Sequence, residues 1–180
     1  MPNPTLDRLS VRDWASSLLQ RDNWVILDTE TTGLDRTAEV IQVGILSGQG
    51  EVVFESLVKP IRPIPWQTTQ IHHITDRMVS RAPGFPQLYT QLQQVLSGKT
   101  VIIYNASFDL RMLRQSCEMH YLRPFNIDSY ACAMQKYAAY AGQLNANGRG
   151  YRLQRLQGGD HSALGDCAAT LRLIQQMAAN

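Results

Sequence analysis

Apolar residues recur along the chain at two periods, one helical and one strand-like, and their alternation predicts an α/β protein. Residues 5–20 carry leucines and Trp14 at helical spacing with charged residues between them, which predicts an amphipathic helix. Trp24–Glu30 begins with four apolar residues and predicts a buried β-strand. Because 180 residues suit one compact core, we expect a single domain over residues 1–180, with residues 1–22 as an N-terminal helical extension.

A hairpin and a crossover are expected after this strand. Two β-branched runs, Val40–Leu46 and Glu51–Val58, flank the glycine-containing turn Ser47–Gly50 and predict an antiparallel pair. The prolines of residues 60–65 then interrupt further pairing and predict a surface crossover. Because large aromatic residues are buried on average, we expect Trp66 to pack in the core, with contact to a substrate or partner as the alternative.

The second half of the chain alternates helices with short strands. Gly84–Leu96 repeats apolar residues at helical spacing, and Thr100–Tyr104 is a second buried run. We expect a last short strand at Phe125–Ile127, after which Asp128 caps a helix that begins near Ser129. Together the elements predict an α/β domain with a mixed sheet.

Composition and charge narrow the class of protein. Cys117, Cys132 and Cys167 are odd in number, lie on apolar helical patterns and form no C-x-x-C pair, which argues against a disulfide or zinc scaffold and favours a reducing cytosol. No run reaches about 18 apolar residues and the N-terminus lacks a secretory pattern, so we expect a soluble, cytoplasmic protein without membrane contact. The net charge of +2 and the pI near 8.5 are only mildly basic, which is weak evidence for a polyanionic partner and argues against a large nonspecific electrostatic footprint.

Asp28 and Glu30 form the first candidate for chemistry. On a strand they project from the same side, about 7 Å apart at roughly 3.3 Å per residue. Carboxylates that close repel each other, and Mg²⁺ relieves the repulsion because it takes hard oxygen ligands and keeps waters for a substrate. Gly33 follows and is expected to adopt the positive φ of a tight turn. The alternative is a strand end whose acids face only water.

Asp109 is a second candidate because it follows the run Thr100–Tyr104 at a strand-to-helix junction. Either Asn105 or Ser107 can cap this helix. Ligands of open α/β sheets gather around such strand ends, which favours a metal role for Asp109. An acid in the first turn of a helix is also favoured by the helix macrodipole alone, and this alternative stays open.

Asp166 and His161 complete the candidate set. Apolar residues at helical spacing place Asp166 near the start of a C-terminal amphipathic helix, and His161 on the loop that enters it. Taken singly, such residues are more often a helix N-terminal acid and a solvent-facing loop histidine. Together with the other acids they form four carboxylates and a histidine, a set suited to two divalent cations and an activated water. That combination predicts a site that cleaves phosphodiesters.

Four motifs in this order resemble the DnaQ-like exonucleases, the histidine-containing branch of the DEDD superfamily. They extend over about residues 23–177, and the full set is far more specific than any single motif. The resemblance implies a 3′-to-5′ exonuclease with a ribonuclease H-like fold, whose mixed five-stranded sheet is flanked by helices. The motifs are Asp28–Leu34, Ile71–Thr75, Asn105–Asp109 and His161–Cys167.

The resemblance also implies roles for single residues. Asp28, Glu30, Asp109 and Asp166 correspond to acids that bind two divalent cations, Mg²⁺ or Mn²⁺, and His161 corresponds to the general base. Free histidine has a pKa of about 6.5 and is largely neutral near neutral pH, as a base requires. Asp28 is our candidate for the bridge between the cations. The implied substrate-binding positions are Thr29, Thr31, Gly33, Leu34, Asn105 and Phe108.

Two positions depart from the family pattern. His73 stands where the family usually has glycine, which puts the local turn conformation in question, and Ser162 stands where a basic residue often follows the histidine. We assign no metal to the adjacent His72 and His73.

A segment rich in glycine and asparagine, Asn145–Gly150, leads into Arg149, Arg152 and Arg155. We interpret these arginines as a solvated loop and helix face, because charge clusters are commonly just exposed. The alternative places them along the substrate backbone.

Three functions are consistent with the motifs. The leading one is a metal-dependent 3′-to-5′ exonuclease that releases nucleoside 5′-monophosphates from DNA in proofreading, repair or end trimming. The second takes RNA as substrate, and the third is a nucleic-acid-binding or polymerase-associated module whose hydrolysis is secondary or lost. The expected partners are single-stranded 3′ ends, DNA in preference to RNA, and a DNA polymerase or repair complex is a candidate partner. The sequence leaves the oligomeric state open.

Overall fold

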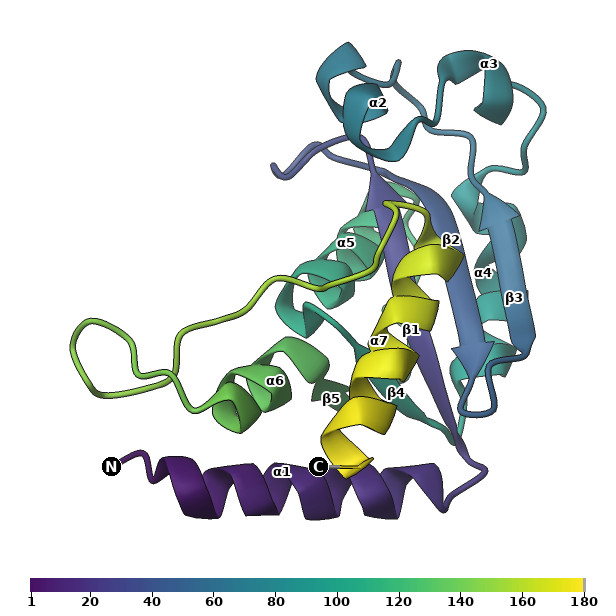
Figure 1. Ribbon diagram of the computed structural model, residues 1–180. Coiled ribbons are helices and arrows are strands. Elements are labelled where there is room, and N and C mark those ends of the chain that lie inside the picture. The colour runs from purple at the N-terminus through teal and green to yellow at the C-terminus, as the bar shows by residue number, and fades with distance from the viewer. Residues whose placement is uncertain (180) are drawn as a thin grey trace.

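The computed structural model describes residues 1–179, which form a five-stranded sheet with helices on both faces (Figure 1). The strands lie side by side in the order β3-β2-β1-β4-β5. β1 is antiparallel to β2 and parallel to β4, so the predicted mixed five-stranded sheet is confirmed. The strands are β1 (Trp24–Thr31), β2 (Val40–Ser47), β3 (Val52–Leu57), β4 (Thr100–Ile103) and β5 (Ser129–Cys132).

The described residues form seven helices, and Figure 1 shows α7 crossing one face of the sheet, α4 and α5 behind the other, and α2 and α3 beyond its end. The predicted N-terminal helix is confirmed as α1, whose N-cap Asn3 accepts a hydrogen bond from the amide of Leu6 at 3.2 Å. No helix among residues 1–179 is long and apolar enough to cross a bilayer. The helices are α1 (Pro4–Leu19), α2 (Trp66–His72), α3 (Asp76–Val79), α4 (Phe85–Leu96), α5 (Ala106–Met119), α6 (Ala133–Ala141) and α7 (Ala163–Ala179).

Each face of β1 contributes to a separate hydrophobic core. Val25 and Leu27 pack with residues of α4 and α5, whereas Trp24 and Ile26 pack with residues of α1 and α7. Successive side chains of a strand point to opposite faces, so the next even-numbered positions continue on the α7 face. The core packing of β1 therefore fixes the direction in which its two acids project.

Gly44 on β2 lets the first turn of α7 rest directly on the sheet. A Cβ at this position would lie 2.8 Å from the carbonyl carbon of Ala163 and 2.8 Å from the amide nitrogen of Leu164. Gly44 is also the residue of β2 that pairs with Asp28 of β1. The close approach therefore places the start of α7 next to Asp28.

The prediction for the last strand was wrong. The structure places β5 at Ser129–Cys132, paired with β4, and α6 begins only at Ala133, so Asp128 precedes a strand and caps no helix. Phe125 and Ile127 are apolar because they pack against the core of the α4 and α5 face, where the Phe125 ring lies 6.1 Å from that of Phe85. Cys132 consequently lies at the end of a strand, and all three cysteines are free.

Two local predictions were also wrong. Trp66 begins α2 directly after Pro65 and is 64% exposed, and it takes no part in the small core that Ile64, Ile74 and Val79 form around α2 and α3. Gly33 does not adopt a positive φ, since the chain turns after β1 through a hydrogen bond from the Thr31 hydroxyl to the Gly33 carbonyl at 2.8 Å.

Residues 143–159, here called the arm, connect α6 to the loop before α7 and extend to the left in Figure 1. Leu144 and Tyr151 form an isolated antiparallel bridge, and the amide of Asn145 donates to the carbonyl of Gly150 at 2.9 Å. The glycine- and asparagine-rich segment is therefore a hydrogen-bonded turn at the tip of the arm.

Candidate active site

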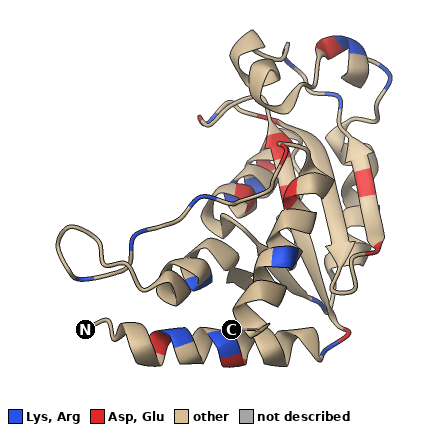
Figure 2. Cartoon of the chain, viewed as in Figure 1, with Lys and Arg blue, Asp and Glu red and all other residues tan. Residues whose placement is uncertain are grey.

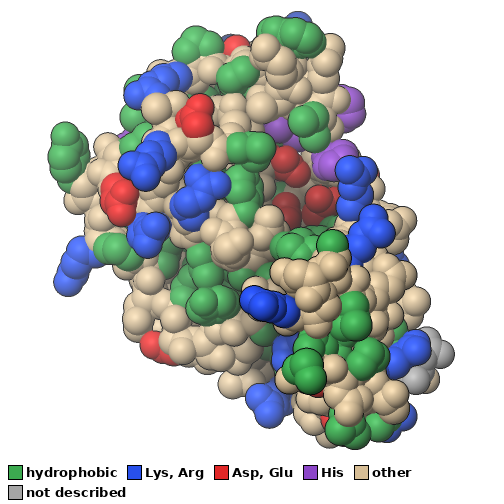
Figure 3. All heavy atoms as spheres, turned by 90° about the vertical axis from the view of Figure 1, so that its left-hand side faces the viewer, with side chains coloured by type: hydrophobic (Ala, Val, Ile, Leu, Met, Phe, Trp, Pro, Cys, Tyr) green, Lys and Arg blue, Asp and Glu red, His purple; other side chains and the backbone are tan. Residues whose placement is uncertain are grey.

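The five residues predicted to carry the chemistry meet in one pocket. It has a volume of about 210 Å³ and lies where β1 ends and where α5 and α7 begin. Figure 2 marks acidic residues at these positions, and Figure 3 shows them as a group in a hollow of the surface with histidines beside it. The pocket is lined by Asp28, Glu30, Asp109, His161 and Asp166, together with Thr29, Tyr104, Asn105, Phe108 and Leu156.

Three of the carboxylates form a compact group on the α7 face of β1. Asp28, Glu30 and Asp166 each place one oxygen within 4.8 Å of the others, a spacing that can hold a metal ion. Hard divalent cations such as Mg²⁺ prefer oxygen ligands of this kind. This group is a candidate metal centre.

Asp109 approaches β1 from the opposite face, since α5 packs on the side away from α7. It is buried, and its Oδ1 accepts hydrogen bonds from the Thr29 amide at 3.0 Å and the Thr29 hydroxyl at 2.8 Å. The Oδ1 atom is thereby fixed. Thr29 lines the pocket, but its polar atoms hold Asp109 and do not project toward a ligand.

The loop before α7 holds Asp166 in a defined orientation. The amides of Asp160 and His161 donate to its Oδ1 at 3.1 and 3.3 Å. A Cβ on Gly159 would collide with the same oxygen, so a larger residue there would displace the Asp166 carboxylate. His161 is exposed and has a φ of 59°, a left-handed conformation that turns the chain sharply into the helix.

Burial and mutual repulsion raise the pKa of the carboxyl groups in the pocket. The pKa of Glu30 is raised to about 8, first by burial and then by the charge of Asp166. The pKa of Asp109 is raised to about 7 by burial, although the hydrogen bonds from Thr29 act in the opposite direction. Burial and the charges of Asp109 and Glu30 raise the pKa of Asp28 well above its ordinary range. Near neutral pH the group therefore retains protons unless a cation offsets its negative charge.

Burial also raises the pKa of Asp166, against the hydrogen bond from the amide of His161. All four carboxyl groups thus disfavour the ionised form in the protein alone. A divalent cation would remove this cost, so the donor set fits a metal of this class.

The predicted substrate-binding positions lie at the rim of the same pocket or in its walls. Asn105 and Phe108 line it, and Leu34 is 77% exposed just beyond the end of β1. Thr31 is buried, with its hydroxyl bonded to the Gly33 carbonyl. Asn105 occupies the N-cap position of α5 without capping it, because its Oδ1 accepts from the hydroxyl of Ser107 at 3.0 Å.

The two adjacent histidines have separate structural roles. His73 ends α2 in the left-handed conformation with a φ of 59°, so the turn usually supplied by glycine is retained. His72 is buried, and its Nδ1 accepts from the Ile74 amide at 3.0 Å. Neither belongs to the carboxylate group that can hold a metal.

Two pocket residues were missed by the sequence interpretation. Tyr104 ends the apolar run before α5, and its hydroxyl donates to the Gln154 carbonyl of the arm at 2.9 Å. Leu156 comes from the arm itself. The apolar run places Tyr104 at the end of a strand, which is a sequence signal for its position near the pocket. No periodic pattern includes Leu156, so the sequence gives no such signal for it.

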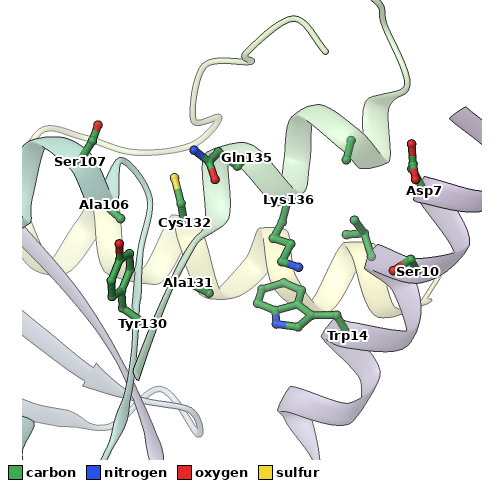
Figure 4. A pocket seen from close by; sticks show the side chains of 12 residues that line it. Asp7, Ser10, Trp14, Ala106, Ser107, Tyr130, Ala131, Cys132, Gln135 and Lys136 are labelled. Carbon is green, nitrogen blue, oxygen red and sulfur yellow. The ribbon is translucent and has the colours of Figure 1, made fainter. Parts of the chain in front are cut away.

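A larger cavity of about 740 Å³ lies between α1, α6 and β5 (Figure 4). Lys136 projects over the ring of Trp14 at 5.0 Å, and Tyr130 and Gln135 line the same cavity. It shares no lining residue with the acidic pocket and holds only one acid, Asp7. Size alone therefore does not identify the chemical site.

The sheet order and the helices on its two faces define the class of the protein: it has the ribonuclease H-like fold of the exonucleases. Exonuclease I of E. coli in complex with a dA16 oligonucleotide superposes with a TM-score of 0.71 at 15% identity, covering 88% of this chain and 42% of that one. Exonuclease X in complex with 5′ overhanging duplex DNA gives a TM-score of 0.60 at 25% identity, covering 87% of this chain and 93% of that one.

The particular family follows from the sequence match. The RNase T family model, described as Exonuclease, matches residues 25–174, and the chain belongs to this family. The resemblance to the DnaQ-like exonucleases is confirmed, and the chain is a hydrolytic nuclease that acts on nucleic acid.

Two relatives illustrate the match. The "Uncharacterized exonuclease CP81" of Escherichia phage 186 is 34% identical over 173 residues, which cover 87% of this chain and 89% of the relative. The DNA polymerase III subunit epsilon of Treponema pallidum is 28% identical over 153 residues, which cover 81% of this chain and 68% of the relative.

Proposed function

We propose that the protein is a metal-dependent 3′-to-5′ exonuclease that releases nucleoside 5′-monophosphates from the ends of DNA. One observation carries the proposal: residues from β1, α5, α7 and the loop before α7 converge on a single pocket whose carboxylates retain protons without a cation. A pocket that only bound a polyanion would have no use for four clustered carboxylates.

Each side chain has a role in this proposal. Asp28, Glu30 and Asp166 would hold a divalent cation, and Asp109 and Asp28 would be available to a second one. Bound cations of this kind supply Lewis acidity and make water a stronger nucleophile near neutral pH.

His161 accepts the proton of the attacking water. It lies at the exposed edge of the pocket beside Asp166, where the loop leaves its ring accessible to solvent. Thr29 acts through Asp109, which it holds by two hydrogen bonds.

DNA is the proposed substrate because several relatives are named as subunits of a DNA polymerase, including the one from Treponema pallidum. The 25% identical exonuclease X was solved with duplex DNA that carries a 5′ overhang. A single-stranded 3′ end and association with a DNA polymerase or repair complex belong to the same proposal.

We also propose that residues 1–180 act as one exonuclease domain. α1 supports this, since its buried residues Val11 and Leu18 belong to the same core as Ile174 of α7. The N-terminal extension is thus packed against the domain that carries the pocket.

Matched oligonucleotides test the proposal. DNA and RNA strands labelled at the 3′ or the 5′ end are incubated with Mg²⁺, Mn²⁺ or chelator, and products are resolved by length. We expect shortening from the 3′ end only, nucleoside 5′-monophosphates as products and no cleavage with chelator. Internal fragments, shortening from the 5′ end or activity in chelator would contradict the proposal, and faster cleavage of RNA would reassign the substrate.

A further inference from the structure

The arm is closed on itself at its base and bonded to the rest of the molecule nearer to α7. The Arg152 amide donates to the Gln143 carbonyl at 2.7 Å within the arm, and the Tyr104 hydroxyl donates to the Gln154 carbonyl at 2.9 Å. At its far end the guanidinium of Arg172 donates to the Gly158 carbonyl at 2.9 Å. The backbone of the arm therefore has a defined position beside the acidic pocket.

A cavity of about 510 Å³ lies between the arm and the junction of β4 with α5. It shares Tyr104, Asn105, Leu156, His161 and Asp166 with the acidic pocket, so the two hollows are continuous. Ligand cavities of about 300–1,000 Å³ hold small organic molecules, and this one is large enough for a nucleotide. A strand whose end lies among the carboxylates can continue into it.

Arg155 is the one arginine of the arm that lines this cavity. Figure 3 shows basic side chains at the right-hand edge of the acidic hollow. Within residues 1–179, Arg155 forms no ion pair: none of the carboxylates lies within salt-bridge distance of it. Its positive charge is therefore not neutralised by the acidic residues. An unpaired guanidinium beside a nuclease pocket is suited to bind a phosphate.

The residue after His161 offers no such contact. Ser162 is neutral, and both its amide and its hydroxyl donate to Oδ1 of Asp160, at 3.0 and 2.7 Å. The cavity walls contributed by Met134 and Leu156 are apolar and suit a sugar or base face.

We propose that Arg155 binds a phosphate of the strand on the 5′ side of the bond to be cut, and that this strand leaves the acidic pocket through the cavity beneath the arm. The inference rests on the proposed 3′-to-5′ exonuclease function. It assigns the departing strand to the arm and not to the larger cavity between α1 and α6, which shares no residue with the acidic pocket.

Two substrates separate binding of the departing strand from the chemistry. The p-nitrophenyl ester of thymidine 5′-monophosphate carries a scissile phosphate but no nucleotide on its 5′ side, whereas a thymidine decanucleotide carries both. We expect Arg155→Gln to raise the KM for the decanucleotide roughly tenfold, because it removes a charge-assisted hydrogen bond. Its kcat/KM for the ester should stay within about twofold of wild type, and Arg155→Lys should recover part of the loss.

Salt dependence provides an independent readout. Each contact with a phosphate of a single strand contributes about 0.7 to the slope of log affinity against log salt concentration. Arg155→Gln should lower the slope for the decanucleotide by about this amount. Arg149→Gln removes the same charge from the tip of the arm, outside the cavity, and should leave both KM and slope unchanged.

Several outcomes would overturn the inference. An unchanged decanucleotide KM in Arg155→Gln would do so, as would an equal loss in Arg149→Gln. Parallel loss of ester hydrolysis would place Arg155 at the reacting phosphate, and a larger loss in Lys136→Gln would move the strand to the cavity of Figure 4. If wild-type protein with Mg²⁺ cleaves neither substrate, the proposed function itself fails, and this inference with it.

Discussion

On the α7 face of β1, three carboxylates approach within 4.8 Å of one another, whereas on the α5 face Asp109 receives two hydrogen bonds from Thr29. The first arrangement is unfavourable in the protein alone, because burial and repulsion raise the pKa of Glu30 to about 8. The second is held in place by the protein's own donors. The pKa of Asp109 is raised as well, to about 7, so the two faces differ in geometry: the position of Asp109 is set by hydrogen bonds, whereas the three carboxylates on the α7 face are grouped without such donors between them.

The largest effect is expected on the α7 face. Asp28→Ala removes the residue proposed to bridge the cations and should reduce hydrolysis of oligonucleotides below detection. Isothermal titration with Mg²⁺ should show lost or strongly weakened binding. Asp128→Ala, an exposed acid outside the pocket, is the matched control and should behave as wild type; substantial activity in Asp28→Ala would remove this residue from the mechanism.

A smaller effect is expected for His161, which lies between the carboxylate group and solvent. His161→Ala should leave the fold intact and slow turnover by roughly two orders of magnitude, as loss of a general base does. Because His161 has a left-handed backbone, His161→Asn is a companion variant that tolerates this conformation. Both variants should be equally slow in single-turnover assays, and near-normal cleavage by either one would refute the assignment.

The α5 face should be less sensitive. Thr29→Val keeps the shape of the side chain but removes the hydroxyl that donates to Asp109, while the amide bond remains. Loss of one hydrogen bond to a charged group costs about 1.5–3 kcal/mol, so we expect activity to fall by roughly tenfold or more. Thr29→Ser retains the donor and should restore most of it. If Thr29→Val were as active as wild type, the organisation of this face would be unimportant for the reaction.

The smallest expected effect is on the pH dependence of stability, and its sign follows from the raised pKa of Glu30. Its pKa is about 8 in the folded protein against an ordinary value of 4.5, so the folded state binds a proton that the unfolded state releases. Without metal, the stabilising contribution of protonated Glu30 is present below about pH 4.5 and is lost as the pH rises to about 8. We therefore expect the Tm of the metal-free protein to fall over this interval.

Mg²⁺ should raise the Tm more at pH 8 than at pH 6, because its ligands must be deprotonated. At a hundredfold excess over its Kd, a ligand adds about 2.7 kcal/mol, or roughly 5–10 °C for a domain of this size. Differential scanning fluorimetry measures both trends. Glu30→Gln should flatten the metal-free pH dependence, and Glu55→Gln on the exposed side of β3 should not. A Mg²⁺ effect that does not grow with pH would contradict the assignment.

The sequence contained most of what places the site, because the relevant signals are local. Strand alternation alone puts Asp28 and Glu30 on the same face, and the boundary of an amphipathic helix puts Asp166 at its start. The proximity of Asp109 to β1 required the resemblance to a known family. Its hydrogen bonds to Thr29 join residues 80 positions apart, and no periodicity predicts such a pair.

The errors arose where tertiary contacts override local preference. The apolar residues Phe125 and Ile127 suggest a strand, but they pack against the core without pairing. The less apolar segment Ser129–Cys132 forms the strand that pairs with β4. Trp66 is exposed because the small core beside α2 is filled by other side chains, Ile64, Ile74 and Val79. The interpretation of Arg149, Arg152 and Arg155 as solvated agrees with their exposure, although they lie outside any helix, and charge patterns carry no information about the cavity that Arg155 lines.

The contact at Gly44 has a consequence for how the enzyme can lose its function. One methyl group added there would collide with the backbone of Ala163 and Leu164 and push the start of α7 off the sheet. Asp166 and His161 would move with it, although the substitution lies on a different strand and touches neither of them. A glycine that carries no reactive group thus controls whether the acids of β1 and the acid of α7 lie in one pocket.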